Sequence, residues 1–224
     1  AMLVSFGSIA QQSIELSTLW QRYAFYAGGI SGLRSMSDSE HYTAQGEGTI
    51  EKYNYHSGEK VALILDVNAL ISEEASVPSF DAYDLSTDEQ WALLETETDQ
   101  IYRRSSKSVV WVVNLQSQQA TKIRPEKISN ATFSPDANYV VYVYDNNLYI
   151  YDISEDAHIR ITSDGAFNKI INGATDWVYE EEFAIVKAFW WSPNSDKLAY
   201  LRFDESNVRS FNMDIYGKES YPNP

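Results

Sequence analysis

Hydrophobic and polar residues alternate with a period of two along most of the chain, a pattern that predicts β-strands with one buried face. Residues 49–55 alternate in this way, and a four-residue turn separates them from the apolar run 61–65, so the two segments are predicted to form a hairpin. Residues 140–144 and 148–151 flank an Asp-Asn-Asn turn and predict a second hairpin. Residues 109–115 are too apolar to form a surface edge and predict a buried strand.

One segment has helical spacing instead. Apolar and aromatic residues recur three or four positions apart over residues 13–26, which predicts an amphipathic helix. Ser13 is the expected N-cap, and Glu15 lies in the expected first turn. The pair Gly28-Gly29 is expected to end the helix.

A short motif recurs four times and decides the predicted architecture. Each copy has an apolar or aromatic residue, a Ser-Pro-Asp-like turn and then a strand; the serines are Ser37, Ser86, Ser134 and Ser192, at intervals of 49, 48 and 58 residues. Serine and aspartate in such turns hydrogen-bond to nearby backbone amides. Short strands that recur about every 40–50 residues are typical of β-propeller blades. The chain is therefore predicted to be all-β, an incomplete β-propeller of about four blades with a short N-terminal helix.

Charge and composition exclude several kinds of site. The chain has 17 Lys and Arg against 32 Asp and Glu, a net charge of −15, so a nucleic-acid partner is not expected. The absence of cysteine excludes disulfides, thiolate metal sites and a cysteine nucleophile. The three histidines lie far apart, and the chain has neither a Gly-x-Ser-x-Gly motif nor a phosphate-binding glycine loop. No catalytic residue, metal or cofactor is expected in this chain, which leaves binding.

The start of the chain indicates a compartment. Residues 2–10 are apolar and small, and Ser8-Ile9-Ala10 has the small-x-small form of a signal-peptide cleavage site. Residues 1–10 are therefore interpreted as the remnant of a signal peptide or a tag; a first core strand is the alternative. On the signal-peptide interpretation the mature protein begins at Gln11 and is exported. Export without cysteine fits the periplasm or cell envelope of a bacterium.

Two charged segments are candidate binding sites. Residues 176–183 place three adjacent glutamates after two large aromatic residues, and carboxylates held together near apolar surface favour a bound cation. A solvated acidic loop is the alternative, which composition alone favours. The pair Arg103-Arg104 beside a serine-rich stretch is the second candidate, with ordinary surface ion pairs as its alternative.

The acidic segment also carries a family resemblance. The residues Asp-Trp-Val-Tyr-Glu-Glu-Glu at 176–182, followed by Trp-Trp-Ser-Pro-Asn at 190–194, resemble the N-terminal propeller of the dipeptidyl peptidase IV family. Stretches at 33–38, 83–105 and 145–150 agree with the family in the same order, so the resemblance spans about residues 13–222. It implies residues 11–35 as an N-terminal helical arm and 36–224 as the N-terminal part of an eight-bladed propeller.

The resemblance also implies a function. Members are serine exopeptidases that release X-Pro or X-Ala dipeptides from peptides with a free N-terminus, and they combine the propeller with an α/β-hydrolase domain that carries a Ser-Asp-His triad. It implies that Glu181 and Glu182 hold the substrate's α-ammonium and that Arg103 reaches the substrate carbonyl. One residue fewer between Glu182 and Trp190 than in the mammalian enzyme leaves Glu180 and Glu181 open as a second register.

Several expectations follow for the chain itself. It lacks the hydrolase domain of the family, so it is expected to be inactive alone and to self-associate through the open flanks of its blades. A non-catalytic envelope propeller that binds proteins is the alternative function. A tripeptidyl or acylaminoacyl oligopeptidase of the same clan is a third, and the acidic motif argues against the acylaminoacyl type because acyl-blocked substrates have no ammonium.

Overall fold

The computed structural model describes residues 15–73 and 76–209, so the predicted cleavage motif at residues 8–10 and the predicted cap Ser13 lie outside the described residues. The chain divides into two compact units, residues 1–31 and residues 32–224. No helix in the described ranges is long and apolar enough to span a membrane.

The helix of the first unit is shorter than predicted. Helix α1 comprises only Leu16–Trp20, and its N-cap, Glu15, makes no side-chain capping bond. None of its residues is buried. Because short helices obtain most of their stability from packing an apolar face, the predicted helix over 13–26 does not extend. Tyr23 already has a left-handed φ of 47°.

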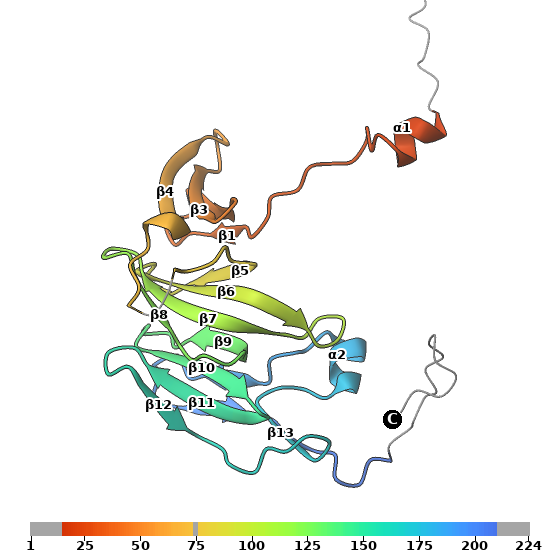
Figure 1. Cartoon of the computed structure of the whole chain (residues 1–224), viewed down its shortest axis with the longest axis vertical. Coiled ribbons are helices and arrows are strands. Elements are labelled where there is room, and N and C mark those ends of the chain that lie inside the picture. Colours follow the sequence, from red (N-terminus) through yellow and green to blue (C-terminus); the bar gives the residue numbers. More distant parts are fainter. Residues whose placement is uncertain (1–14, 74–75, 210–224) are drawn as a thin grey trace, which may run out of the picture. The chain divides into compact units, whose positions relative to one another are not determined.

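The second unit consists of successive antiparallel sheets (Figure 1). Three of them have four strands each: β1 (Arg34–Ser35), β2 (His41–Gln45), β3 (Thr49–Asn54) and β4 (Lys60–Asp66); β5 (Ala82–Leu85), β6 (Trp91–Gln100), β7 (Ser106–Asn114) and β8 (Gln119–Lys122); β9 (Ser129–Phe133), β10 (Tyr139–Tyr144), β11 (Asn147–Asp152) and β12 (Ala157–Arg160). A 3-10 turn, η1 (Val67–Ala69), follows β4. In each sheet, strands adjacent in sequence are neighbours in space, which is the order of propeller blades. The prediction of an all-β chain built from blades is confirmed.

The fourth repeat is built differently. Strand β13 (Ile170–Asn172) pairs with β16 (Arg202–Asp204), and β14 (Phe189–Trp191) pairs with β15 (Leu198–Tyr200). Helix α2 (Trp177–Phe183) lies between β13 and β14 in the chain. Within the described residues, these four strands form two separate two-stranded sheets.

Both predicted hairpins are present. Strands β3 and β4 pair from Thr49 opposite Asp66, and β10 and β11 pair from Tyr144 opposite Asn147. The second hairpin turns through Asp145 and Asn146, with φ values of 47° and 57°. Asp and Asn adopt this left-handed conformation more readily than other side chains, which explains why this Asn-rich turn is easily predicted from sequence.

The repeated turn is confirmed, with a correction to its first copy. The N–H groups of Ser86, Ser134 and Ser192 donate to the carbonyl five residues later, and the residue three positions on has a left-handed φ. In the first copy it is the N–H of Met36 that donates to the carbonyl five residues later, that of His41. The carbonyl of Met36 also accepts a hydrogen bond from the N–H of Ser39. The alignment on Ser37 was therefore wrong by one residue, because Met36 lacks the hydroxyl that marks the other copies.

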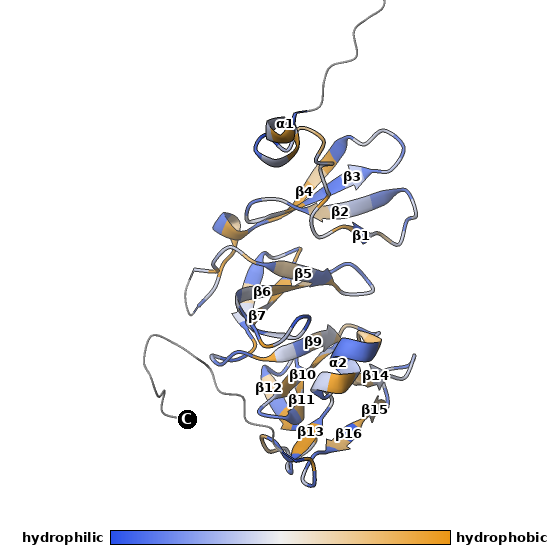
Figure 2. Ribbon diagram, turned by 90° about the vertical axis from the view of Figure 1, so that its right-hand side faces the viewer, coloured by the Kyte–Doolittle hydropathy of each residue, from blue (hydrophilic) through white to orange (hydrophobic). Residues whose placement is uncertain are grey.

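Apolar side chains fill the spaces between consecutive sheets. One cluster joins Ile50 and Leu65 of the first sheet to Leu94 and Trp111 of the second. A second cluster joins the second and third sheets, and a smaller one joins the third sheet to Phe189 of β14. Figure 2 shows orange, apolar stretches along strands of these sheets, for example in β4. This packing fixes the ends of the sheets, where the candidate site lies.

Candidate functional site

The acidic segment forms a short helix, which the sequence analysis did not predict. The side chain of Asp176 caps α2 by accepting a hydrogen bond from the N–H of Tyr179 at 2.9 Å. The helix ends after seven residues at Ala184, whose φ of 56° is left-handed. Consecutive helical residues point about 100° apart, so the three adjacent glutamates face different surroundings.

Glu180 is buried and holds a loop. Only 3% of the residue is exposed. Its Oε1 accepts hydrogen bonds from the backbone N–H groups of Arg104 at 2.7 Å and Ser105 at 2.9 Å. Burial alone would raise the pKa of Glu180, but the hydrogen-bond donors of Ser105 and Arg104 lower it below its usual value. Glu180 therefore ties the loop between β6 and β7 to α2, as the adjacent ribbons in Figure 1 show.

The loop held by Glu180 presents Arg103 to the next glutamate. Arg103 Nε lies 3.4 Å from Glu181 Oε1, and the Glu181 side chain is 19% exposed whereas that of Arg103 is 71% exposed. Glu182 is exposed and makes no hydrogen bond or ion pair with the described residues. The structure thus brings Arg103 and Glu181 together and leaves Glu182 beside them on the same helix.

This arrangement can bind a cation. Arg103 compensates one of the two accessible carboxylates, so Glu181, Glu182 and Arg103 together carry one net negative charge. Carboxylate oxygens form charge-assisted hydrogen bonds with an ammonium group, and the guanidinium leaves donors for a nearby carbonyl oxygen. Across residues 15–73 and 76–209, no three His, Asp or Glu side chains are grouped in a way that could hold a metal ion. That the chain uses no cofactor remains a prediction.

The comparisons with known proteins bear on this site. The family model described as the dipeptidyl peptidase IV (DPP IV) N-terminal region matches residues 86–224, which include both Arg103 and all three glutamates. The chain belongs to this family. The family resemblance of the sequence is thereby confirmed, while the roles of Arg103, Glu181 and Glu182 remain untested.

Solved and curated members of the dipeptidyl peptidase IV family agree with the fold. The crystal structure of Porphyromonas gingivalis dipeptidyl peptidase 4 matches with a TM-score of 0.82 and 33% identity, over 95% of this chain and 30% of that one. Human prolyl endopeptidase FAP is 33% identical over 88% of this chain and 25% of its own length. Dipeptidyl aminopeptidase B of Saccharomyces cerevisiae is 40% identical over 61% of this chain and 17% of its own length. The chain thus spans a quarter or less of these curated relatives.

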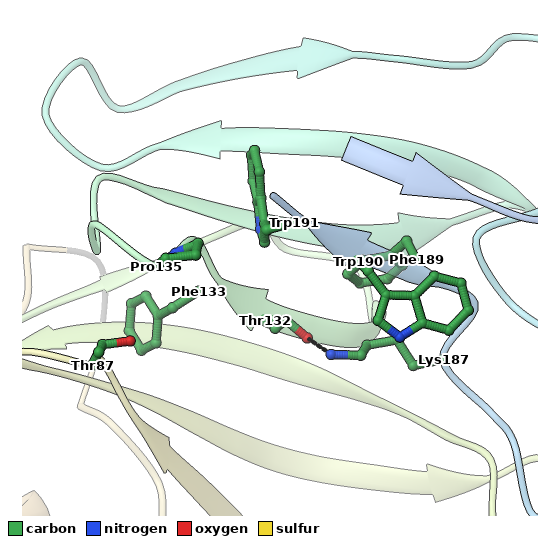
Figure 3. A pocket seen from close by; sticks show the side chains of 8 residues that line it. All are labelled: Thr87, Thr132, Phe133, Pro135, Lys187, Phe189, Trp190 and Trp191. Carbon is green, nitrogen blue, oxygen red and sulfur yellow. Dashed lines mark hydrogen bonds between the residues drawn. The ribbon is translucent and has the colours of Figure 1, made fainter. Parts of the chain in front are cut away.

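A separate cavity lies between the sheets of this family member, and no sequence motif marks it as a binding site. It has a volume of about 240 Å³ and is open to solvent. Figure 3 shows the partly buried Lys187 and the indole of Trp190 at one end, with Thr132 between them and the residues Phe133 and Pro135. Lys187 is an isolated lysine in an apolar stretch, and no spacing pattern in the sequence marks it.

Proposed function

We propose that this chain is the part of a dipeptidyl peptidase that binds the free N-terminus of the substrate, through Glu181, Glu182 and Arg103. The observation that carries the proposal is the ion pair between Arg103 and Glu181, held in place by the buried contact of Glu180 with the same loop. The substrate class is peptides with a free N-terminus and Pro or Ala as the second residue, as the family resemblance implies.

The burial of Glu180 supports the register Glu181–Glu182 over Glu180–Glu181. Only 3% of the Glu180 residue is exposed, and its carboxylate already accepts two backbone hydrogen bonds, so it has little capacity for a ligand. Glu181 and Glu182 are both accessible and follow directly on the same helix. An ammonium that bridges these two carboxylates limits how far a peptide chain can pass the site, which would account for the release of dipeptides.

The catalytic residues of the proposed enzyme are not among the binding residues Arg103, Glu181 and Glu182. The nucleophile and its partners would belong to an α/β-hydrolase domain of the same protein, and peptide hydrolysis would take place there. Export to a bacterial periplasm or envelope is part of the same proposal and rests on the small, apolar residues 2–10.

The test is a titration of the 224-residue chain with Ala-Pro amide, followed by NMR. This peptide has a free ammonium and no carboxylate, so it probes the glutamates alone. We expect Glu181→Gln and Glu182→Gln each to weaken binding by about tenfold or more, since each removes a charge-assisted contact of roughly 1.5–3 kcal/mol. Glu155→Gln, an exposed glutamate in the β11–β12 turn, is the matched control and should leave binding unchanged. Equal binding by all four proteins would contradict the proposal and favour a solvated acidic surface.

A further inference from the structure

Lys187 has few partners for a partly buried ammonium group. Its Nζ donates to Thr132 Oγ1 at 3.4 Å and lies 5.4 Å from the centre of the Phe189 ring. It forms no ion pair with any of the described residues, although the chain has a net charge of −15. An ammonium carries three donors, so two of them have no described acceptor.

The surroundings of Lys187 are unfavourable for its charge. Burial lowers the pKa of the Lys187 ammonium, and the charge of the Asp84 carboxylate opposes this shift only in part. The Thr132 hydroxyl itself donates to the carbonyl of Asn130, so its oxygen is left to accept from Lys187. A charge in this position gains most from a ligand that brings an anion.

The cavity next to Lys187 restricts the ligand. At about 240 Å³ it is smaller than the roughly 300–1,000 Å³ typical of pockets for drug-sized molecules, which indicates a small ligand. Its walls combine the polar side chains of Thr87, Thr132 and Lys187 with aromatic residues. Of these, Trp190 is 49% exposed, whereas Phe133 and Phe189 are buried. A single cation beside aromatic walls fits one carboxylate attached to a compact apolar group, whereas a phosphate would require several converging donors.

We propose that this cavity binds a short peptide through its C-terminal carboxylate, with Lys187 Nζ as the donor and the half-exposed Trp190 against the apolar residue of the peptide. The cavity includes none of Arg103, Glu181 and Glu182, so this is a second site. That its occupant is the dipeptide released by the enzyme rests on the proposed function. The capture of a C-terminal carboxylate by Lys187 does not.

The ligands of the test separate the two sites. Acetyl-Ala-Pro has a carboxylate and no ammonium, so it can bind at Lys187 but offers nothing to the glutamates. Acetyl-Ala-Pro amide has neither charge, and inorganic phosphate is an anion without an apolar group. The 224-residue chain is titrated with each, and binding is followed at the Trp190 indole N–H signal, assigned by its loss in Trp190→Phe. We expect acetyl-Ala-Pro to shift this signal with at least tenfold higher affinity than its amide or phosphate.

Variants then assign the carboxylate to Lys187. Lys187→Met keeps the apolar stem and should weaken binding of acetyl-Ala-Pro at least tenfold, while Lys187→Arg retains the charge and should bind within a few-fold of the original chain. Lys169→Met, an exposed lysine outside the cavity, is the matched control.

Equal affinity for acetyl-Ala-Pro and its amide would overturn the proposal without any variant. Unchanged binding by Lys187→Met, or phosphate binding as tight as that of acetyl-Ala-Pro, would overturn it as well. Each of these outcomes leaves the test with Ala-Pro amide at the glutamates unaffected.

Discussion

The Oε1 atom of Glu180 accepts a hydrogen bond from the backbone N–H of Arg104 over 2.7 Å, although the two residues are 76 positions apart in the chain. This bond joins the loop that carries Arg103 to the helix that carries Glu181 and Glu182. The first of the three glutamates thus holds this loop in place. The other two are the residues proposed to bind the N-terminus of the substrate.

Glu180→Gln tests this division of roles through stability. An amide oxygen is a weaker acceptor than a carboxylate, so the backbone N–H groups of Arg104 and Ser105 lose their charge-assisted bonds to the buried Glu180. We expect a loss of roughly 1–3 kcal/mol in the free energy of unfolding. Denaturant unfolding at pH 7 measures it, with Glu182→Gln as the exposed control, expected within about 0.5 kcal/mol of the original chain. Equal effects of the two substitutions would contradict a structural role for Glu180.

The difference in stability between the original chain and Glu180→Gln should also depend on pH, with a definite sign. Because hydrogen bonds lower the pKa of folded Glu180 below its ordinary value of 4.5, the folded state holds its charged form more strongly than the unfolded state does. The stability contributed by Glu180 is therefore complete above about pH 4.5 and decreases as the pH falls below it. We expect the difference between the original chain and Glu180→Gln to shrink from pH 7 to below pH 4. A difference that grows on acidification would contradict the assignment.

Arg103→Ala is expected to affect binding rather than folding. The Arg103 side chain is 71% exposed, so its removal should change the free energy of unfolding by no more than about 0.5 kcal/mol. It removes the donor expected to reach the peptide carbonyl, and we predict about tenfold weaker binding of Ala-Pro amide. Arg104→Ala, its exposed neighbour, is the control for the loss of one positive charge. If Arg103→Ala and Arg104→Ala bind Ala-Pro amide with equal affinity, Arg103 contributes only its charge, and its expected hydrogen bond to the peptide carbonyl is contradicted.

Gly173 lies just before the site and has no room for a side chain. Its φ is +75°, and an added Cβ would lie 2.4 Å from Cδ2 of the fully buried Leu148. Gly173→Ala should therefore cost at least about 2 kcal/mol of stability through backbone strain and overpacking. Gly58→Ala separates these two causes, because Gly58 has a φ of +70° with no atom within 4 Å of the added Cβ. We expect Gly58→Ala to cost about 1 kcal/mol; an equal loss in both variants would exclude the steric contact with Leu148.

Self-association through the first sheet is expected in solution. Strand β4 forms one edge of this sheet and exposes Val61 by 54% and Leu63 by 52%. Exposed apolar edge strands pair readily with other chains. Light scattering should show an average mass that rises with concentration, and Leu63→Glu should reduce this rise. A monomer at all concentrations would contradict the expectation.

The chain alone should not cleave a Gly-Pro chromogenic substrate. None of its 224 residues lies in a Gly-x-Ser-x-Gly motif, and it has no cysteine to act as an alternative nucleophile. Release of the chromophore by the purified chain, persisting after treatment with a serine-protease inhibitor that silences contaminants, would show an unrecognised nucleophile.

Features with local chemical causes could be predicted from the sequence. The hairpin turn at Asp145 and Asn146 and the serine-containing blade turns follow from the backbone preferences and hydrogen bonds of these residues, so both are visible in a single sequence. The first blade turn was misaligned because its hydroxyl is missing: Met36 occupies the place of serine, and only the backbone bonds to His41 and from Ser39 identify it.

Features with distant causes could not be predicted. Helix α2 has only seven residues, with an aspartate cap and a left-handed end, and its stability depends on the contact of Glu180 with a loop 75 residues earlier. The burial of Glu180 beside two accessible glutamates of the same type is likewise set by that loop. Lys187 became a candidate because the fold places it against Thr132 and the cavity, which no local pattern indicates.

The central claim is that Glu181 and Glu182 recognise a free N-terminal ammonium. The most direct measurement is the ratio of the dissociation constants of acetyl-Ala-Pro amide and Ala-Pro amide for the 224-residue chain, since the two peptides differ only in that charge. We expect the acetylated peptide to bind at least tenfold more weakly, corresponding to about 1.4 kcal/mol or more. Equal dissociation constants for the two peptides would contradict it.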